Sequence, residues 1–440
     1  MKSQNSIPST KVERATKFVA TGFKVGGNYI KHYAKKAFDS DLSRDELHRD
    51  NASDIYNTLS ELKGSALKVA QMMSMDRNLL PRAYSDKFQM AQYSAPPLSG
   101  PLVIKTFVKY FGKPPQQLFD TFDMEATNAA SIGQVHRATK NGKQLAVKVQ
   151  YPGVAQSVRS DLKMVKPFAV RLMNLNEKDV DKYMDEVETK LLEETDYKLE
   201  LRSSQEISAE CAHIQNLHFP KYYPELSSER ILAMDWLDGM HMEDFLKTNP
   251  SQQVRDTIGQ ALWDFYDFQV HALRKVHADP HPGKFLMRPD GTMGVLDFGC
   301  VKEIPESYYT NYFTLINPDN VKDEALRERI FFNLEFLTAN DTPQERKFFG
   351  DLFTTMIELL GRPFHEDTFD FGDESYFQSI YDYADHLSNL KELRESNAAR
   401  GAKDSLYINR TYYGLYAILN QLQAVVRTSS PDWIWQPVAR

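Results

Sequence analysis

The sequence predicts an α+β protein made of a helical extension, a strand-rich lobe and a mostly helical lobe. Amphipathic helical patterns occupy the region before residue 100. Two extended segments then flank Asn141-Gly142, a strong hairpin signal. After Pro305 the pattern is helical to the end of the chain. We expect the extension at 1–100, the strand-rich lobe at 101–235 and the helical lobe at 236–440.

The composition is that of an ordinary soluble globular protein. The 440 residues are 42% hydrophobic and carry a net charge of −7, which argues against a nucleic-acid binder. Two distant cysteines, Cys211 and Cys300, provide no disulfide framework and favour a reducing compartment. We find neither a secretory signal nor an apolar run of transmembrane length. The expectation is a cytoplasmic protein, peripheral at a membrane if it contacts one.

Positive charge is concentrated near the N-terminus. Residues 1–38 carry eight basic side chains and one acidic one, so this segment is +7 and the remainder is −14. In the helix expected over 11–38, Lys17, Lys24 and Lys31 follow at intervals of seven and share a face. Three readings stay open: a solvated face of a helix packed on the core, a contact with an anionic membrane, and a mitochondrial-type presequence. The apolar residues recurring along this helix are Ala15, Phe18, Val19, Gly22, Val25, Tyr29 and Tyr33.

The other expected helices and strands lie in the extension and in the two lobes. A second extension helix covers about 52–75, and the segment SAPPLSGP at 94–101 interrupts the helical pattern. The later elements are a hairpin over 133–150, helices over 158–211, a strand at 231–236 and a short hairpin over 285–296. The helical pattern after Pro305 shows no internal repeats or low-complexity tracts.

Lys148 is the candidate for contact with phosphate groups. It lies near the end of the second strand of the first hairpin, fifteen residues after Gly133. A lysine facing a cleft from a strand suits contact with nucleotide phosphates. If buried, it needs an acidic partner to stay charged. Alone this signal is weak, because exposed lysines are common on strands.

Two aspartates downstream can supply the remaining chemistry. Asp279 lies in HADPHPGKFL (277–286), and Asp297 opens an Asp-Phe-Gly motif eighteen residues later. Asp279 can accept a proton from an attacking hydroxyl or water, and Asp297 can hold Mg²⁺ against nucleotide phosphates. The short hairpin expected between them makes the pair far more specific than either motif alone.

At these motifs the sequence resembles the AarF/UbiB/ADCK (ABC1-like) family of atypical protein-kinase-like proteins. The segment NAASIGQVH (128–136) resembles the alanine-rich loop of the family, and 279–285 resembles its catalytic loop. The segment ETDYKLE (194–200) is similar to its helix-C motif, and KVAQ (68–71) to its KxGQ signature. The motifs keep the family's order, which implies a two-lobed protein-kinase-like fold.

The resemblance implies a set of residues that bind ATP and Mg²⁺. Glu200 would pair with Lys148, Asp279 and Lys148 would serve catalysis, and Asp297 would hold the metal. The other nucleotide contacts that it implies are Ala129, Ala130, Ser131, Ile132, Gly133, Gln134 and Val135 in the loop, with Met234 and Trp236 at the hinge.

The KxGQ-like motif belongs to a helix that, in the family, is thought to cover the active site. Carried over to this chain, Lys68 and Gln71 would approach Glu194 and Asp196. Such a cover would occupy the place where a peptide substrate otherwise binds.

Three positions depart from the family pattern. Asn128 replaces the first alanine of the loop and Ala70 the glycine of KxGQ, both mild changes. Lys284 stands five residues after Asp279, where an asparagine normally helps to hold a metal, and a protonated lysine cannot ligate one. Its ammonium is expected either beside Asp279, partly replacing the second metal, or swung out to solvent.

The function that we predict is that of an ATP-binding atypical kinase or ATPase with Mg-dependent phosphoryl chemistry. The resemblance implies a link to isoprenoid quinone or membrane-lipid metabolism and to proteins of those pathways. Two alternatives stay open: a nucleotide-binding pseudokinase that uses ATP as a conformational switch, and a true protein or small-molecule kinase. Lys284 favours the switch, whereas the intact Lys148 and Asp279 favour the kinase.

Overall fold

The computed structural model describes residues 11–36, 45–62, 66, 68, 84, 87, 98–129, 132–173, 177–390, 400–428, 430–436 and 438. The chain divides into two compact units. The first unit contains residues 1–202 and 221–236, and the second contains 203–220 and 237–440. Each is described by itself below.

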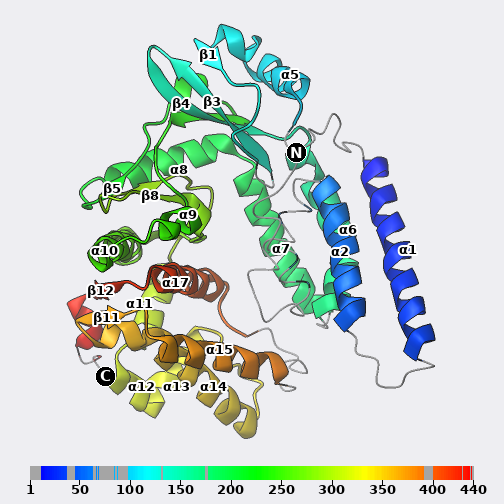
Figure 1. The fold of residues 1–440 in the computed structure, drawn as a ribbon. Coiled ribbons are helices and arrows are strands. Elements are labelled where there is room, and N and C mark those ends of the chain that lie inside the picture. The colour runs from blue at the N-terminus through cyan, green and yellow to red at the C-terminus, as the bar shows by residue number, and fades with distance from the viewer. Residues whose placement is uncertain are drawn as a thin grey trace. The chain divides into compact units, whose positions relative to one another are not determined.

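The helical part of the first unit is formed by α1 (Lys11–Lys36), α2 (Asp45–Leu62), α6 (Val154–Met173) and α7 (Glu177–Glu194). Figure 1 shows α1 beside α2, and α1 also contacts α6. The expected first helix is thereby confirmed, and the second begins earlier than predicted. The part of that helix expected beyond residue 62, and most of the interrupting segment at 94–101, lie outside the described residues.

Helix α1 packs through polar side chains. Arg14 is 3% exposed and donates to both carboxylate oxygens of Asp161 on α6, each at 2.6 Å, and to the Leu62 carbonyl at 2.8 Å. Asn28 donates to Asn51 at 3.1 Å and to Asp54 at 2.9 Å on α2. The inward face of this helix is therefore polar among the side chains described.

The outward face of α1 carries apolar and basic side chains. Val19 is 59% exposed and Phe23 is 78% exposed, beside the exposed Lys24 and Lys31. Val19, one of the apolar residues that recur along this helix, therefore lies on its exposed side. The buried hydrogen bonds of Arg14 and its neighbours set the rotation of the helix, and they override the apolar periodicity.

The sheet of the first unit has five strands, and all of its pairings are antiparallel. They are β1 (Thr121–Phe122), β2 (Asn128–Ala129), β3 (Gly133–Lys140), β4 (Lys143–Gln150) and β6 (Ile231–Asp235), in the order β1-β3-β4-β6 with β2 also on β3. Asn141 and Gly142 turn between β3 and β4 with φ of 50° and 75°, as a type I′ turn requires. The predicted hairpin and the strand at 231–236 are confirmed.

The first unit also contains α5 (Gly100–Phe111) and two 3₁₀ turns, Pro115–Gln117 and Pro224–Leu226. Helix α8 (Tyr197–Glu210) begins in this unit and ends in the second. Buried residues of α5, such as Val103 and Phe107, pack with Val147 and Val149 of β4 in one hydrophobic cluster. This cluster holds the sheet on the side of α5.

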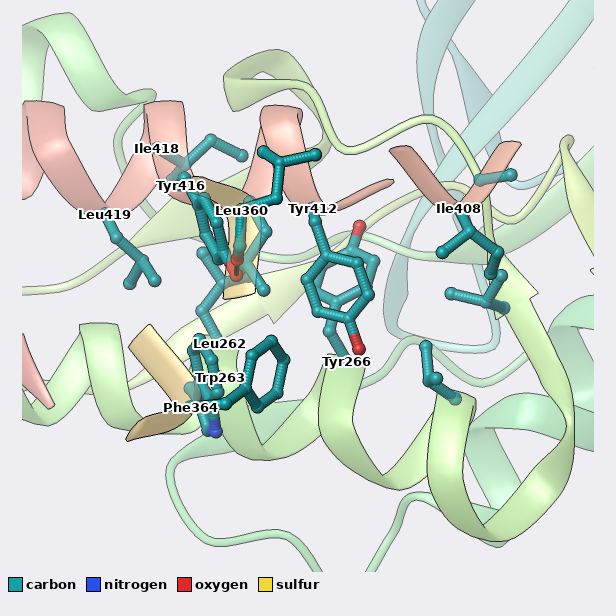
Figure 2. Close-up of a cluster of buried hydrophobic side chains, with 14 of the residues drawn as sticks. Leu262, Trp263, Tyr266, Leu360, Phe364, Ile408, Tyr412, Tyr416, Ile418 and Leu419 are labelled. Atoms are coloured by element: carbon teal, nitrogen blue, oxygen red, sulfur yellow. Dashed lines mark hydrogen bonds between the residues drawn. The ribbon is translucent and has the colours of Figure 1, made fainter. Parts of the chain in front are cut away.

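The second unit is mostly helical. Its helices are α9 (Met242–Lys247), α10 (Gln252–Phe268), α11 (Glu306–Thr314), α12 (Pro318–Lys322), α13 (Glu324–Asn333), α14 (Pro343–Gly361), α15 (Glu374–Asn389) and α17 (Lys403–Leu422). A π turn, Gln269–Leu273, extends α10, and 3₁₀ turns occur at Pro282–Lys284, Arg362–His365 and Asp432–Trp435. Figure 2 shows the aromatic and aliphatic side chains that α10 and α17 bury together.

Short strands complete the second unit. Strands β8 (Phe285–Met287) and β9 (Met293–Val295) form the hairpin that the sequence predicted, with β5 (Leu217–His218) parallel to β9. Strands β7 (Lys275–His277) and β10 (Val301–Glu303) pair antiparallel. The prediction of helix alone after Pro305 was wrong, because β11 (Thr368–Asp370) pairs with β12 (Val425–Arg427). Within the described ranges, no helix is long and apolar enough to cross a membrane.

Candidate active site

Lys148 lies in the middle of the sheet of the first unit and is held by an acid on α8. Strand β4 pairs it with Val135 of β3 and with Leu232 of β6. Its Nζ donates to the two carboxylate oxygens of Glu200 at 2.7 and 3.0 Å. The side chains of Lys148 and Glu200 are 15% and 3% exposed. The structure therefore contains the ion pair that the resemblance implied.

Tyr197 supports this ion pair from one turn earlier on α8. Its ring centroid lies 4.9 Å from the Lys148 Nζ, within the range of a cation–π contact. A Cβ on Gly133 would lie 2.7 Å from the Tyr197 hydroxyl and 2.8 Å from the Val149 carbonyl, so only glycine fits there. Sequence reasoning missed Tyr197, although its position three residues before Glu200 on one helix face was a usable signal.

An apolar surface adjoins Lys148 on the same sheet. Ala146, Leu232 and Met234 are buried in one cluster with Tyr197, and Val135 and Trp236 pack against it. Arg137 stacks on the Trp236 ring, its guanidinium carbon 4.6 Å from the ring centroid. The predicted hinge residues Met234 and Trp236 thus share a surface with the predicted loop residue Val135.

The predicted phosphate loop is described in part. Ala129 pairs with Gln134 across β2 and β3, while Ala130 and Ser131 lie outside the described residues. The Gln134 side chain is fully buried and accepts from the Leu98 amide at 2.6 Å. Ile132 is 6% exposed in the hydrophobic cluster of α5. These two side chains serve packing, so a contact with nucleotide at Ile132 or Gln134 would be made by the main chain.

The KxGQ-like motif contributes one contact within the described residues. Lys68 Nζ lies 3.1 Å from a Glu194 carboxylate oxygen, with the two side chains 16% and 12% exposed. Gln71 lies outside the described residues. Asp196 accepts from the amides of Lys198 and Leu199 at 3.0 and 3.2 Å, which caps the start of α8. That cap places the first turn of the helix, which carries Glu200.

The catalytic-loop candidate Asp279 belongs to the second unit and follows β7. The backbone before it is held on two sides, because the Ala278 amide donates to the Cys300 carbonyl at 2.8 Å and the His277 amide donates to Gln269 at 2.9 Å. Gln269 opens the π turn that extends α10. The local backbone of Asp279 is thus tied both to Cys300, directly after the Asp-Phe-Gly motif, and to the π turn that extends α10.

Two cations share the carboxylate of Asp279. Lys284 Nζ donates to Oδ2 at 2.8 Å, and Arg410 of α17 donates to Oδ1 at 2.5 Å. The side chains of Asp279 and Lys284 are 6% and 15% exposed. The expectation that Lys284 lies beside Asp279 is met, and the alternative of a stem swung out to solvent was wrong. Arg410 was missed, because nothing in the local sequence of α17 marks it.

Lys284 also contacts a neutral histidine. Its Nζ lies 3.2 Å from His277 Nε2, and the Tyr266 hydroxyl lies 3.1 Å from His277 Nδ1. Burial, assisted by the charge of Lys284, lowers the pKa of His277 to about 3. Burial alone would lower the pKa of Lys284, but the charges of Asp279 and Asp297 outweigh it and raise this pKa above its ordinary value. At neutral pH the lysine is therefore charged and the imidazole can accept its hydrogen bond.

Asp297 is half-buried and stands next to this group. Its Oδ1 accepts from the Gly299 amide at 2.7 Å, and the Leu296 amide donates to the Lys284 carbonyl at 2.9 Å. The described residues contain no group of three or more acidic, histidine or cysteine side chains able to hold a metal. Mg²⁺ usually takes one or two carboxylates together with phosphate oxygens and water. This donor set fits one Mg²⁺ shared with a phosphate.

Comparisons with known proteins agree on one family. A model of the ABC1 atypical kinase-like domain matches residues 90–325. The probable serine/threonine-protein kinase abkA of Dictyostelium discoideum is 25% identical over 450 residues, covering 97% of this chain and 79% of that protein. The mitochondrial atypical kinase COQ8 of Saccharomyces cerevisiae is 25% identical over 434 residues, covering 96% and 84%.

A solved structure agrees with the fold. The complex of Rv3197 with erythromycin from Mycobacterium tuberculosis aligns with a TM-score of 0.58 and 26% sequence identity. The alignment covers 87% of this chain and 95% of that one. The two-lobed kinase-like α+β fold expected from the sequence is thus confirmed.

Proposed function

Because the chain belongs to the ABC1 atypical kinase-like family, we propose that it binds ATP with Mg²⁺ and transfers or releases the γ-phosphoryl group. The observation that carries this proposal is the ion pair of Lys148 with Glu200, at 2.7 Å and almost buried. A lysine held in this way on a central strand is the part of a kinase that binds nucleotide phosphates. Burying such a pair without a ligand to bind brings little stability.

The nucleotide and the metal would each be held by particular side chains. Lys148 would donate to phosphate oxygens, and the apolar surface of Ala146 and Met234 would pack against adenine. Asp297 would hold the metal, which supplies neutralisation of phosphate charge and orientation of the transferred group. Both elements are present in the described residues.

Asp279 would accept the proton in the chemical step. A hydroxyl or water oxygen forms a bond to the γ-phosphorus, and the bond from that phosphorus to the β–γ bridging oxygen breaks, which releases ADP. The proton of the attacking oxygen passes to the Asp279 carboxylate. Holding Asp279 between Lys284 and Arg410 orients its oxygens, and each oxygen keeps a second lone pair for that proton.

The position of Lys284 also favours a second candidate, a nucleotide-binding switch. Its ammonium binds Asp279 at 2.8 Å, at the position where an asparagine would help to hold a second metal. A protein that retained only one metal could bind ATP well and transfer phosphate slowly. Turnover distinguishes this candidate from the kinase.

The deciding experiment measures release of radiolabelled phosphate from ATP by the pure protein, with and without anionic liposomes. Asp279→Asn is expected to lower turnover by about 10² to 10⁴-fold, the usual contribution of a general base, while ATP binding is retained. If the parent protein binds ATP but neither releases labelled phosphate nor transfers it to itself or to a lipid under either condition, the switch is correct. If Asp279→Asn is as active as the parent, this loop is not used for catalysis.

Liposomes are included in the assay because of the side chains on the outward face of α1. Phe23 and Val19 are exposed there beside Lys24 and Lys31, a combination that suits the surface of an anionic bilayer. Lys17 forms an ion pair with Glu61 on α2, so we assign the contact to the other two lysines. Together with the mitochondrial COQ8 relatives, this face supports a role in isoprenoid quinone or membrane-lipid metabolism.

The membrane contact has a direct test. Each lysine near an anionic surface contributes about 1 kcal/mol, so Lys24→Glu with Lys31→Glu should weaken co-sedimentation with acidic liposomes by about thirtyfold or more. The control is Lys105→Glu with Lys109→Glu, which reverses two exposed charges on α5. Equal binding by both double variants would contradict the assignment to α1.

A further inference from the structure

Helix α17 contacts the catalytic-loop candidate from far along the chain. Arg410 donates to Asp279 Oδ1 at 2.5 Å across 131 residues of sequence. Residue 410 also lies beyond the segment 90–325 that matches the family domain. We infer that Arg410 is a positioning residue for the proposed reaction, holding the Asp279 carboxylate in the orientation that accepts a proton. This inference rests on the proposed function.

One turn after Arg410, α17 touches the same loop again. A Cβ on Gly414 would lie 2.5 Å from Pro280 Cγ and 2.7 Å from the Pro280 carbonyl oxygen. Both distances are below any ordinary carbon contact, so the helix and the loop can approach this closely only because residue 414 is glycine. Arg410 and Gly414 thus engage two consecutive residues of the loop from one face of α17.

The opposite side of α17 is anchored in the core. Figure 2 shows Tyr412 and Tyr416 of α17 among Leu262, Trp263 and Tyr266 of α10. The rings of Tyr416 and Trp263 are nearly parallel, at 4° with centroids 6.4 Å apart, and both residues are 1% exposed. A helix packed in this way has little freedom to move, so Arg410 acts as a fixed support and not as a mobile latch.

The two cations of Asp279 differ in what they can fix. Lys284 offers a rotatable ammonium on a flexible stem, whereas the guanidinium of Arg410 is planar and its N–H directions are set. With Oδ1 on Arg410 and Oδ2 on Lys284, the plane of the carboxylate is defined at both ends. A misplacement of about 1 Å at a reacting group can lower a rate by about a hundredfold. Loss of Arg410 should therefore appear in kcat.

The test compares three variants by ATP hydrolysis and by thermal unfolding. Arg410→Gln should lower kcat by about tenfold to a hundredfold with the KM for ATP unchanged, because Arg410 is assigned no contact with ATP. Arg410→Lys keeps the charge and should recover part of the loss. Arg255→Gln is the matched control, since Arg255 is half-buried and donates to the Leu422 carbonyl at the other end of α17. It should leave kcat unchanged.

Gly414→Ala gives a second route to the same question. It adds one methyl group against Pro280 and leaves the charges around Asp279 in place. A fall in kcat with bound ATP retained would show that the distance between α17 and the loop matters. This variant is also informative where Arg410→Gln is too unstable to assay.

The possible outcomes separate this inference from the proposed function. If Asp279→Asn is inactive while Arg410→Gln and Gly414→Ala match the parent, Arg410 has no positioning role and the proposed function stands. A faster Arg410→Gln would make α17 an inhibitory contact and would equally overturn the inference. If the parent neither releases nor transfers phosphate, or Asp279→Asn is fully active, the proposed reaction fails and the role of Arg410 fails with it.

Discussion

Lys148 in the first unit and Lys284 in the second are both paired with a carboxylate, and each lysine side chain is 15% exposed. Their surroundings differ. Glu200 binds Lys148 through both of its oxygens, and an aromatic ring lies against the ammonium. Asp279 instead divides its oxygens between Lys284 and a second cation, Arg410.

The two sites differ in their net charge. The Lys148–Glu200 pair is neutral in sum, and the ammonium of Lys148 remains a charged donor for a phosphate oxygen. Asp279 with Lys284 and Arg410 sums to +1, and Asp297 lies close enough to raise the pKa of Lys284. Equal depth of burial therefore does not imply equal function: the first pair suits binding, and the second arrangement suits the orientation of one carboxylate.

The largest effect on nucleotide binding is expected at Lys148. Lys148→Ala should weaken Mg-ATP binding by about a hundredfold, because it removes a charged donor to the phosphates. It should also lower the free energy of unfolding by about 3 kcal/mol, since Glu200 is left buried without that cation. Isothermal titration with ATP and urea denaturation measure the two effects.

A second substitution separates the two effects of Lys148→Ala. Adding Glu200→Gln removes the buried charge, so it should recover part of the stability while ATP binding stays weak. Recovery of binding along with stability would mean that Lys148 acts only through folding.

A smaller effect is expected at Lys284. Lys284→Asn replaces a charge with a metal-binding amide, so the variant should bind two Mg²⁺ per nucleotide where the parent binds one. Where the metal had limited the rate, phosphate release should rise by a few-fold. Metal titration at saturating nucleotide measures the stoichiometry. If neither stoichiometry nor ATP affinity changes, Lys284 does not act on the nucleotide.

The smallest effect on nucleotide chemistry is expected at a third buried pair, Asp341 with Arg400, whose side chains are 4% and 6% exposed. Hydrogen bonds from Arg400 hold the pKa of Asp341 below its ordinary value. The stabilisation is therefore complete above about pH 4 and is lost as the pH falls below that value. Asp341→Asn should remove this acid dependence and lower stability at pH 7 by about 3 kcal/mol.

The same variant is the control for the comparison. Asp341 contacts none of the residues proposed to bind nucleotide among those described, so ATP affinity should not change. Denaturation curves at pH 3 and pH 7, beside ATP titration, test both statements. A loss of ATP binding in Asp341→Asn would show that stability alone can account for the Lys148 result.

Local patterns in the sequence identified most of the elements. The turn at Asn141-Gly142 was predictable because few residue pairs adopt positive φ twice in succession. Lys148 and Glu200 were identified through motifs and not through their contact, since 52 residues separate them. Strands β11 and β12 have three residues each and lie far apart in the chain, so no alternating pattern could reveal them.

Two features could not be predicted because they depend on the rotation or placement of a helix. Apolar periodicity in α1 does not reveal that Val19 is exposed, because the bonds of Arg14 and Asn28 set the rotation of the helix. Arg410 is one arginine among several in the last third of the chain, and only the packing of α17 selects it. A single sequence does not show how a helix is rotated or which distant residue its packing brings to Asp279.

The contact between Arg14 and Asp161 limits how this protein can be shortened. The family match begins at residue 90, so by that measure removal of the first 44 residues would leave the domain intact. Yet Asp161 is fully buried on α6, and Arg14 supplies two hydrogen bonds to it. A protease or a truncation that removes α1 would take away the guanidinium that neutralises this carboxylate in the first unit. Helix α1 therefore supplies the cation that neutralises Asp161 on α6. A protein shortened by α1 should also carry Asp161→Asn, which removes the charge that Arg14 balanced.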